Sequence, residues 1–333
     1  MKTVVWVMSS LLLCACDDGG DENRHLDAGN GSGDGGGSGM ACANPMTLTA
    51  GTVYTDYTVP AETLLNGGAA TAYAWKVSSD SPCDSVLRAN DATLYSLSGE
   101  TTNTVAFRPT LPGKYTVSLE ATTASGTVDV CGTVDVTAPQ GSLRVEMCTD
   151  GTPNTDIDLH VHRPGSTAAW FNATDDCFYN NCVAQTNGRV NWGLADSQLS
   201  ACQKSPNGSL YTTRGNCPNP RMDSDTLDFR EFENTSIDNP PQGMPMRVMA
   251  HYYAGSSTPI HPVVAIYCGS TRKAVFGAAP DQLQGFNKPG GLGAGSMWRV
   301  ADVTMNGNDC TVTALHPPSM STGYYVTTDN TAY

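Results

Sequence analysis

The residues best suited to chemistry lie in one short alternating segment, residues 156–162. Its polar members and its apolar members alternate as Asp156, Ile157, Asp158, Leu159, His160, Val161 and His162. Successive side chains of a β-strand point to opposite faces, so the four polar side chains share one face when the apolar three face a core. Carboxylates and imidazoles are ligands for divalent metal ions. The segment therefore predicts a strand that carries four potential metal ligands.

A second acidic stretch, residues 222–234, could complete an oxygen-rich site. Ca²⁺ takes roughly six to eight oxygen ligands. The stretch is not an EF-hand, because Leu227 stands where an oxygen ligand is expected and Asn234 where the bidentate glutamate should be. If the two acidic stretches converge, the Ca²⁺ ligands that we expect are Asp156, Asp158, Asp223, Asp225 and Glu233. The alternative is that these acids lie on a solvated face and in turns.

The same strand also allows a zinc site. His160 and His162 share a face, and His251 lies on another predicted strand, so the three could form the type of site found in zinc-dependent hydrolases. Histidines on an exposed strand commonly bind no metal, however, and no candidate general base is marked. The sequence contains no Gly-x-Ser-x-Gly or His-Glu-x-x-His motif, and the glycine-rich run 289–295 lacks the strand-to-helix setting of a nucleotide site. We therefore expect a protein that is not an enzyme.

The elements that would position these residues are predicted to be strands. Apolar residues alternate with polar ones over residues 73–77, 115–121 and 143–147, and further strands are expected at 246–253 and 263–268. No window shows a sustained helical period with caps. We predict an all-β protein with two β-sandwich domains: an immunoglobulin-like domain over residues 41–139, a larger jelly-roll-like sandwich over residues 142–316, and a loosely held C-terminal tail over residues 317–333.

The N-terminal region indicates export. The segment Leu13-Cys14-Ala15-Cys16 closes a short apolar run and resembles the processing site of bacterial lipoproteins. The resemblance implies a signal peptide over residues 1–15 and lipidation of Cys16; the alternative is an ordinary secretory signal. Residues 16–40, rich in glycine and aspartate, predict a flexible tether. We expect a lipid-anchored protein of the bacterial cell envelope, and we favour the outer membrane or the cell surface over the inner membrane.

The cysteine count agrees with export. Setting aside Cys14 and Cys16, the remaining cysteines are Cys42, Cys83, Cys131, Cys148, Cys177, Cys182, Cys202, Cys217, Cys268 and Cys310. An even set in an exported chain favours disulfide bonds. Proximity and strand placement favour pairing Cys177 with Cys182, Cys202 with Cys217, and Cys268 with Cys310. The first predicted domain holds three of the ten cysteines. If all ten are paired, at least one bond crosses to the second domain, with Cys148 favoured; otherwise two thiols stay free.

The net charge of the protein limits the classes of molecule that it is expected to bind. The net charge of −14 opposes binding to nucleic acid and to anionic lipid. After the N-terminal region, no segment is apolar over the length that a membrane-spanning helix needs. The N-terminal lipid is thus the only membrane attachment that the sequence predicts.

Two family resemblances add to this interpretation. The segments Tyr73-Ala-Trp75-Lys-Val77 and Leu111-Pro-Gly-Lys-Tyr115-Thr-Val-Ser-Leu119 make the first domain similar to a polycystic-kidney-disease (PKD)-type immunoglobulin-like repeat. The second domain resembles the YfaP-like family of exported bacterial proteins of unknown function. That resemblance rests on the Asp-x-Asp-Leu-His-Val strand and on residues 170–172, 176–182, 191–193, 219–225 and 247–253. The chain keeps Asp223, Asp225, Glu233 and Asn234 of the family's acidic pattern and departs from it at Thr226, Phe229, Glu231 and Phe232.

These observations predict a lipid-anchored envelope protein with a binding, adhesion or structural role. The first domain would be a spacer. The second domain, ordered by Ca²⁺, would contact a glycan or protein ligand through exposed aromatic residues such as Trp192, Tyr252 and Tyr253. The zinc-dependent hydrolase is the alternative function, and a structural subunit of a larger surface assembly is a third.

Overall fold

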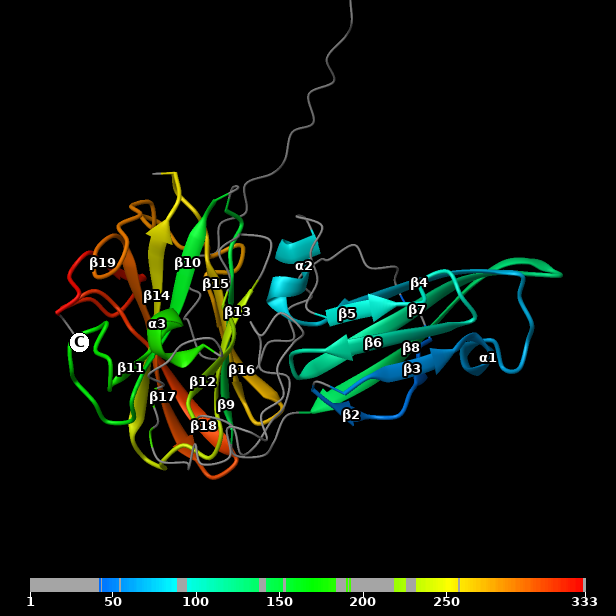
Figure 1. Ribbon diagram of the computed structural model, residues 1–333, viewed down its shortest axis with the longest axis horizontal. Helices are drawn as coiled ribbons and strands as arrows, with labels where there is room; N and C mark the ends of the chain where they lie inside the picture. The colour runs from blue at the N-terminus through cyan, green and yellow to red at the C-terminus, as the bar shows by residue number, and fades with distance from the viewer. Residues whose placement is uncertain are drawn as a thin grey trace, which may run out of the picture. The chain divides into compact units, whose positions relative to one another are not determined.

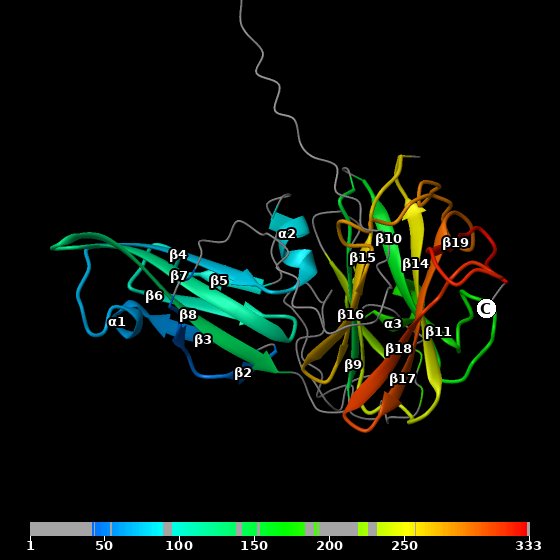
Figure 2. The same cartoon turned by 180° about the vertical axis from the view of Figure 1, so that it is seen from behind.

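In the part of the chain that the structure describes, β-strands are the dominant secondary structure (Figures 1 and 2). A computed structural model describes residues 42, 44–53, 55–88, 95–137, 142–151, 154–183, 190, 192, 219–225, 232–256 and 258–331, all of which belong to one unit over residues 37–333. The predicted all-β sandwich fold is confirmed. The predicted signal peptide, Cys16 and the predicted tether lie outside the described residues.

The first sandwich consists of two sheets. One contains β1 (Met46–Thr47), β2 (Gly51–Thr52), β4 (Ala72–Ser79), β7 (Gly113–Thr123) and β8 (Gly126–Thr137), in the order β1-β8-β7-β4 with β2 also paired to β8. The other, in the order β3-β6-β5, contains β3 (Tyr57–Pro60), β5 (Tyr95–Ser98) and β6 (Thr104–Pro109). Trp75 and Val77 are buried as the alternation predicts, and they pack with Phe107 of the facing sheet.

Two short helices accompany this sandwich, α1 (Ala61–Leu64) and α2 (Pro82–Arg88). Neither was predicted, because one or two turns are too short to show a sustained helical period. In α2, Pro82 occupies the first helical position and Asp84 lies in the first turn, both of which favour a helix N-terminus. Cys83 and Leu87, four residues apart, face the core.

The second sandwich also has two sheets. One, in the order β11-β10-β14-β17-β18 with β19 paired to β17, contains β10 (Asp156–His162), β11 (Asp176–Cys177), β14 (Pro245–Ala254), β17 (Met297–Asn306), β18 (Asp309–Ala314) and β19 (Tyr325–Thr327). The other, in the order β12-β13-β9-β15-β16, contains β9 (Leu143–Cys148), β12 (Arg221–Ser224), β13 (Glu233–Ile237), β15 (Val263–Cys268) and β16 (Thr271–Phe276). Helix α3 (Tyr179–Cys182) follows β11.

The core of this sandwich lies between the two sheets. Ile157, Leu159 and Val161 of β10 belong to it, as the alternation predicts. They pack in one cluster with residues of the facing strands such as Val145 and Ile266. The polar residues of β10 therefore lie on the opposite face of its sheet.

Disulfide bonds occur as expected. Cys177 is bonded to Cys182 and Cys268 to Cys310, the two pairings that proximity and strand placement favoured. Two further bonds join Cys42 to Cys131 and Cys83 to Cys148. The Cys83–Cys148 bond links α2 of the first sandwich to β9 of the second, so Cys148 does reach back as predicted. Cys202 and Cys217 lie outside the described residues.

Two details differ from the sequence-based expectations. The C-terminal segment is not a loose tail up to residue 331, because β19 pairs with β17 and the carbonyl of Asn330 accepts a hydrogen bond of 3.1 Å from the backbone amide of Trp170. Tyr252 is not an exposed aromatic, because its ring is fully buried and stacks on Phe286.

None of the described helices is long and apolar enough to cross a bilayer.

Candidate metal centre

The polar face of β10 is buried rather than solvated. His160 and His162 have no exposed surface, and Asp158 is 3% exposed. The chain that follows β10 returns across this face: Trp170 stacks on His162 with ring centroids 3.9 Å apart, and Phe178 stacks on His160 at 4.9 Å. The alternatives of an exposed histidine strand and of a solvated acidic face are therefore wrong for these residues, because sequence alternation assigns a face but not what covers it.

Three carboxylates from the two acidic stretches converge beside β10. Asp156, Asp158 and Glu233 each offer an oxygen atom, and these atoms all lie within 4.8 Å of one another. Asp156 and Asp158 belong to β10, whereas Glu233 belongs to β13 of the facing sheet. The cluster therefore spans the edge where the two sheets of the sandwich meet.

The backbone explains why Glu233 reaches β10. β11 pairs only with Val161 and His162, so among the described strands none pairs with the earlier part of this edge of β10. The carboxylate of Glu233 accepts a hydrogen bond of 2.6 Å from the backbone amide of Leu159. A side chain from the second sheet thus satisfies a buried backbone donor of the first.

Burial and mutual repulsion disfavour the simultaneous ionisation of the three carboxylates in this cluster. Burial, together with the charges of Asp158 and Asp225, raises the pKa of Asp156 to about 7. Burial and the charges of Asp225, Asp158 and Asp156 raise the pKa of Glu233 well above its usual range. The Oδ1 atom of Asp156 is buried without a hydrogen-bond partner among the described residues. Protonation or a bound cation would relieve this repulsion.

The predicted Ca²⁺ ligands do not all meet in this cluster. Asp225, which directly follows β12, acts on Asp156 and Glu233 through its charge but is not among the three residues whose oxygens converge. The side chain of Asp223 lies outside what the structure describes. The convergence of β10 with Glu233 is the geometry that a shared cation site requires.

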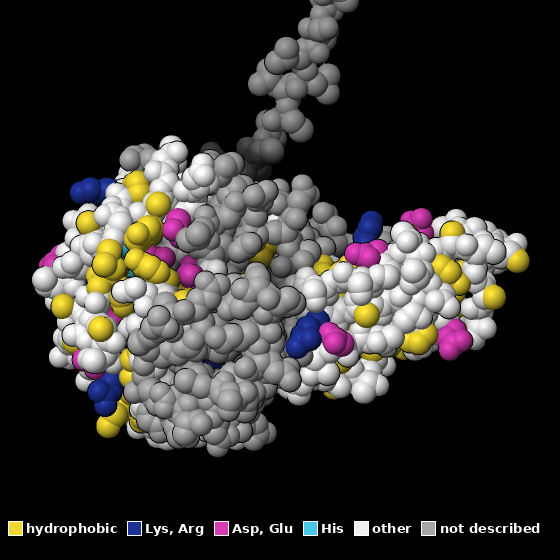
Figure 3. Space-filling view, viewed as in Figure 1, with side chains coloured by type: hydrophobic (Ala, Val, Ile, Leu, Met, Phe, Trp, Pro, Cys, Tyr) yellow, Lys and Arg dark blue, Asp and Glu magenta, His cyan; other side chains and the backbone are white. Residues whose placement is uncertain are grey.

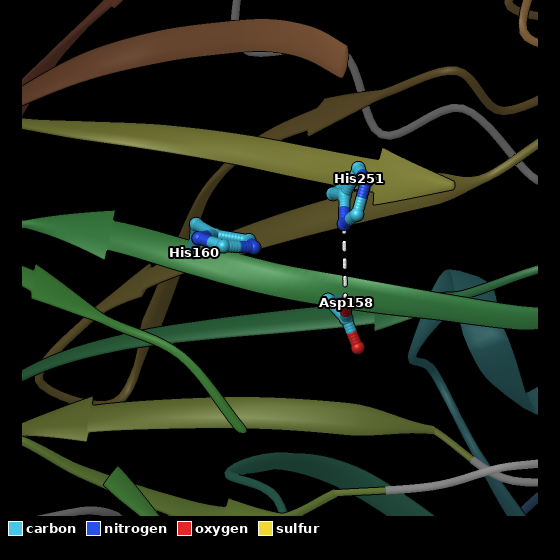
Figure 4. Close-up of side chains that lie close together, drawn as sticks. All are labelled: Asp158, His160 and His251. Carbon is cyan, nitrogen blue, oxygen red and sulfur yellow. Dashed lines mark hydrogen bonds and ion pairs between the residues drawn. The ribbon is translucent and has the colours of Figure 1, made fainter. Parts of the chain in front are cut away.

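A second group of metal ligands adjoins the first. Asp158, His160 and His251 each offer a ligand atom, and these atoms also lie within 4.8 Å of one another. Figure 4 shows His251 directed from β14 toward Asp158, with the ring of His160 beside them. His251 Nδ1 lies 3.1 Å from Asp158 Oδ2. Asp158 is therefore common to both groups.

Hydrogen bonds fix the orientation of both imidazoles. His160 Nδ1 donates to Asp176 Oδ2 over 2.8 Å, and the same oxygen accepts a bond of 2.8 Å from the backbone amide of Phe171. Phe171 has φ of +63°, a conformation that is uncommon for a residue other than glycine. His251 Nε2 donates to the carbonyl of Ala294 over 2.6 Å. One ring nitrogen of His160 is therefore held by an acceptor, and both ring nitrogens of His251 lie against acceptors, Asp158 and the carbonyl of Ala294.

The three-histidine set expected from the sequence is not the set that forms. Asp158, which lies opposite His251 in the pairing of β10 with β14, takes the place of His162. His162 instead stacks on Trp170, and burial lowers its pKa to about 4. Sequence reasoning did not assign the partner of His160, Asp176, although it noted the segment that begins there. The sequence signal that could have pointed to Asp176 is its position directly before the predicted Cys177–Cys182 bond.

Comparison with known proteins does not assign a function to these residues. The sequence matches no protein-family model and no curated protein.

Proposed function

We propose that the protein is a lipid-anchored component of the bacterial cell envelope with a binding or structural role, and that Ca²⁺ braces its second sandwich at Asp156, Asp158 and Glu233. The observation that carries the calcium site is the convergence of these three buried carboxylates within 4.8 Å. Buried charges in proteins are paired or coordinate metal ions. A divalent cation would turn their mutual repulsion into attraction.

The donor set favours Ca²⁺ over softer metals. Carboxylate oxygens are ligands of hard cations, and Ca²⁺ accepts irregular sets completed by carbonyl oxygens and water. Asp225 adds negative charge close to the cluster. Because Glu233 comes from one sheet and Asp156 from the other, a bound ion would hold the two sheets together at this edge.

The envelope location is supported by the sequence and by the disulfide bonds. The lipoprotein-type site at Cys16 provides the anchor, and the bonds among the described cysteines are typical of an oxidising compartment outside the cytoplasm. The PKD-like first sandwich would be a spacer, and the YfaP-like second sandwich would carry the binding surface.

The ligand that we propose for this surface is a glycan or a protein. Tyr253 and Trp192 are partly exposed and remain candidates to contact it, whereas the buried Tyr252 does not. On the face drawn in Figure 3, hydrophobic side chains of the second sandwich lie beside acidic ones, while Lys and Arg side chains are scattered. This pattern and the charge of −14 argue against nucleic acid.

Thermal unfolding tests the calcium site. At a free Ca²⁺ concentration of about one hundred times the dissociation constant, binding would stabilise the fold by about 2.7 kcal/mol, a rise of roughly 5 to 10 °C in Tm. We expect this rise with Ca²⁺ and its reversal with chelator in the purified chain. An unchanged Tm at millimolar Ca²⁺ would contradict the site.

Membrane partitioning tests the anchor separately. We expect the full chain, made in a bacterial host, to enter the detergent phase of a phase-separation assay, and the Cys16→Ser variant to stay in the aqueous phase. Cys14→Ser is the matched control, because it lies two residues away and should leave anchoring intact. Detergent partitioning of Cys16→Ser would refute the lipid anchor.

A further inference from the structure

We propose that Asp158, His160 and His251 form a separate site for a divalent transition-metal ion of the Zn²⁺ type. This inference goes beyond the calcium site, with which it shares only Asp158. Its ligand atoms lie within 4.8 Å of one another, and all three residues are buried.

The strand register builds this arrangement. Asp158 lies directly opposite His251 in the antiparallel pair of β10 and β14. His160 lies two residues further along β10 and therefore on the same face, as a diagonal neighbour of His251. Three ligands on two neighbouring, hydrogen-bonded strands of one sheet are held by a rigid scaffold, as a metal site requires.

The hydrogen bonds present the imidazoles as metal ligands. A histidine that binds a metal commonly donates its other ring N–H to a carboxylate or a backbone carbonyl. His160 donates Nδ1–H to Asp176 over 2.8 Å, and His251 donates Nε2–H to the carbonyl of Ala294 over 2.6 Å. The nitrogen that remains on His160 is Nε2, whereas His251 Nδ1 faces Asp158 Oδ2 over 3.1 Å, so a metal ion bound here would contact both of these atoms.

The remaining nitrogen of His160 supplies an independent observation. His160 Nε2 is buried and has no hydrogen-bond partner among the described residues, although a buried polar atom is normally satisfied. In Figure 4 the His160 ring extends toward the line that joins His251 and Asp158. A metal ion there would complete the coordination of this nitrogen.

The donor set identifies the class of metal. Two imidazoles and one carboxylate suit Zn²⁺ and related transition metals, whereas Ca²⁺ takes oxygen ligands. A catalytic zinc site keeps an open position for water and substrate. Phe171 and Phe178 pack against His160 with ring centroids 4.8 Å and 4.9 Å away, and the ligands are buried, so the site suits a structural ion.

Cobalt titration of the metal-free chain tests the proposal. Co²⁺ replaces Zn²⁺ in such sites and gives visible absorption bands that report nitrogen and oxygen coordination. We expect one equivalent of Co²⁺ to bind, with bands that one equivalent of Zn²⁺ abolishes. We expect His160→Gln to weaken binding more than tenfold and His316→Gln, a histidine outside the cluster, to leave it unchanged. Equal Co²⁺ binding by wild type and His160→Gln would overturn the proposal.

Two further variants separate this site from the calcium site and from loss of folding. Glu233→Gln should abolish the Ca²⁺-dependent rise in Tm but retain the Co²⁺ bands, and His160→Gln should do the reverse. Asp176→Asn keeps an oxygen that can accept from His160 and Phe171, so the chain should fold while metal affinity falls by about 10- to 100-fold. If His160→Gln fails to fold, unchanged Co²⁺ affinity in Asp176→Asn would overturn the proposal.

Discussion

Glu233 of β13 accepts a hydrogen bond of 2.6 Å from the backbone amide of Leu159 of β10, so a carboxylate of one sheet completes the edge of the other. This bond fixes Glu233 among Asp156 and Asp158, where its charge is unfavourable. The hydrogen bond to the buried amide therefore favours this position of the Glu233 side chain, whereas repulsion from the neighbouring acids opposes it.

Replacing Glu233 with glutamine should separate these two effects. The amide oxygen can still accept the bond from Leu159, while the charge is removed. In chelator we expect the Tm of Glu233→Gln to equal or exceed that of the wild type, because the repulsion is relieved. The Ca²⁺-dependent rise in Tm should disappear. Glu120→Gln, the same change at an exposed position, should alter neither measurement, and a Ca²⁺ response retained by Glu233→Gln would refute its role as a ligand.

The pH dependence of stability has a defined sign. Burial and neighbouring acids raise the pKa of Asp156 to about 7, so between about pH 4 and pH 7 the folded chain binds more protons than the unfolded one. The free energy of unfolding should therefore fall as pH rises through this window and level off above it. In metal-free buffer, Asp156→Asn should show a smaller decline than the wild type.

Calcium should remove this decline, because the ion binds the ionised carboxylates. Ca²⁺ affinity is then expected to increase from pH 5 to pH 8, as protons cease to compete. Calorimetric titrations at several pH values measure it directly. Affinity that weakens as pH rises would contradict a carboxylate site.

The Cys83–Cys148 bond should contribute more stability than the short Cys177–Cys182 bond. The bonded cysteines are 65 residues apart in the first case and 5 in the second. Loop-closure entropy then gives contributions of about 4 and about 2 kcal/mol to the free energy of unfolding. Urea unfolding of the Cys83→Ala/Cys148→Ala and Cys177→Ala/Cys182→Ala variants checks this order. A larger loss in the second pair would mean that native-state contacts, not chain entropy, dominate.

Much of the fold could be predicted because its signals are local. Alternation over residues 73–77 and 156–162 identifies strands and the faces that enter the cores, and β4 and β10 follow it. Cysteines close in sequence, such as Cys177 and Cys182, pair as proximity favoured. The short helix α2 was missed because seven residues are too few to show a helical period.

The candidate site was predicted only in part. Its remaining residues depend on the register between paired strands and on the segment that packs over the polar face of β10. Asp158 joins His251 because two strands distant in sequence pair in one register, and the sequence pattern of a single strand does not specify its partner's register. Asp176 reaches His160 because the chain after β10 folds back across the polar face.

The sequence by itself determined that the chain forms disulfide-bonded β-sandwiches and that Asp156, Asp158, His160 and His162 share one face of a strand. These properties follow from side-chain alternation, which is a pattern of neighbouring residues, and from the cysteine content, which can be counted in the sequence. Only the tertiary structure decided that this face is buried, that Glu233 joins the acids and that His162 stands apart from His251. Burial and cross-strand contacts are relations between distant segments, and packing of the whole sandwich sets them.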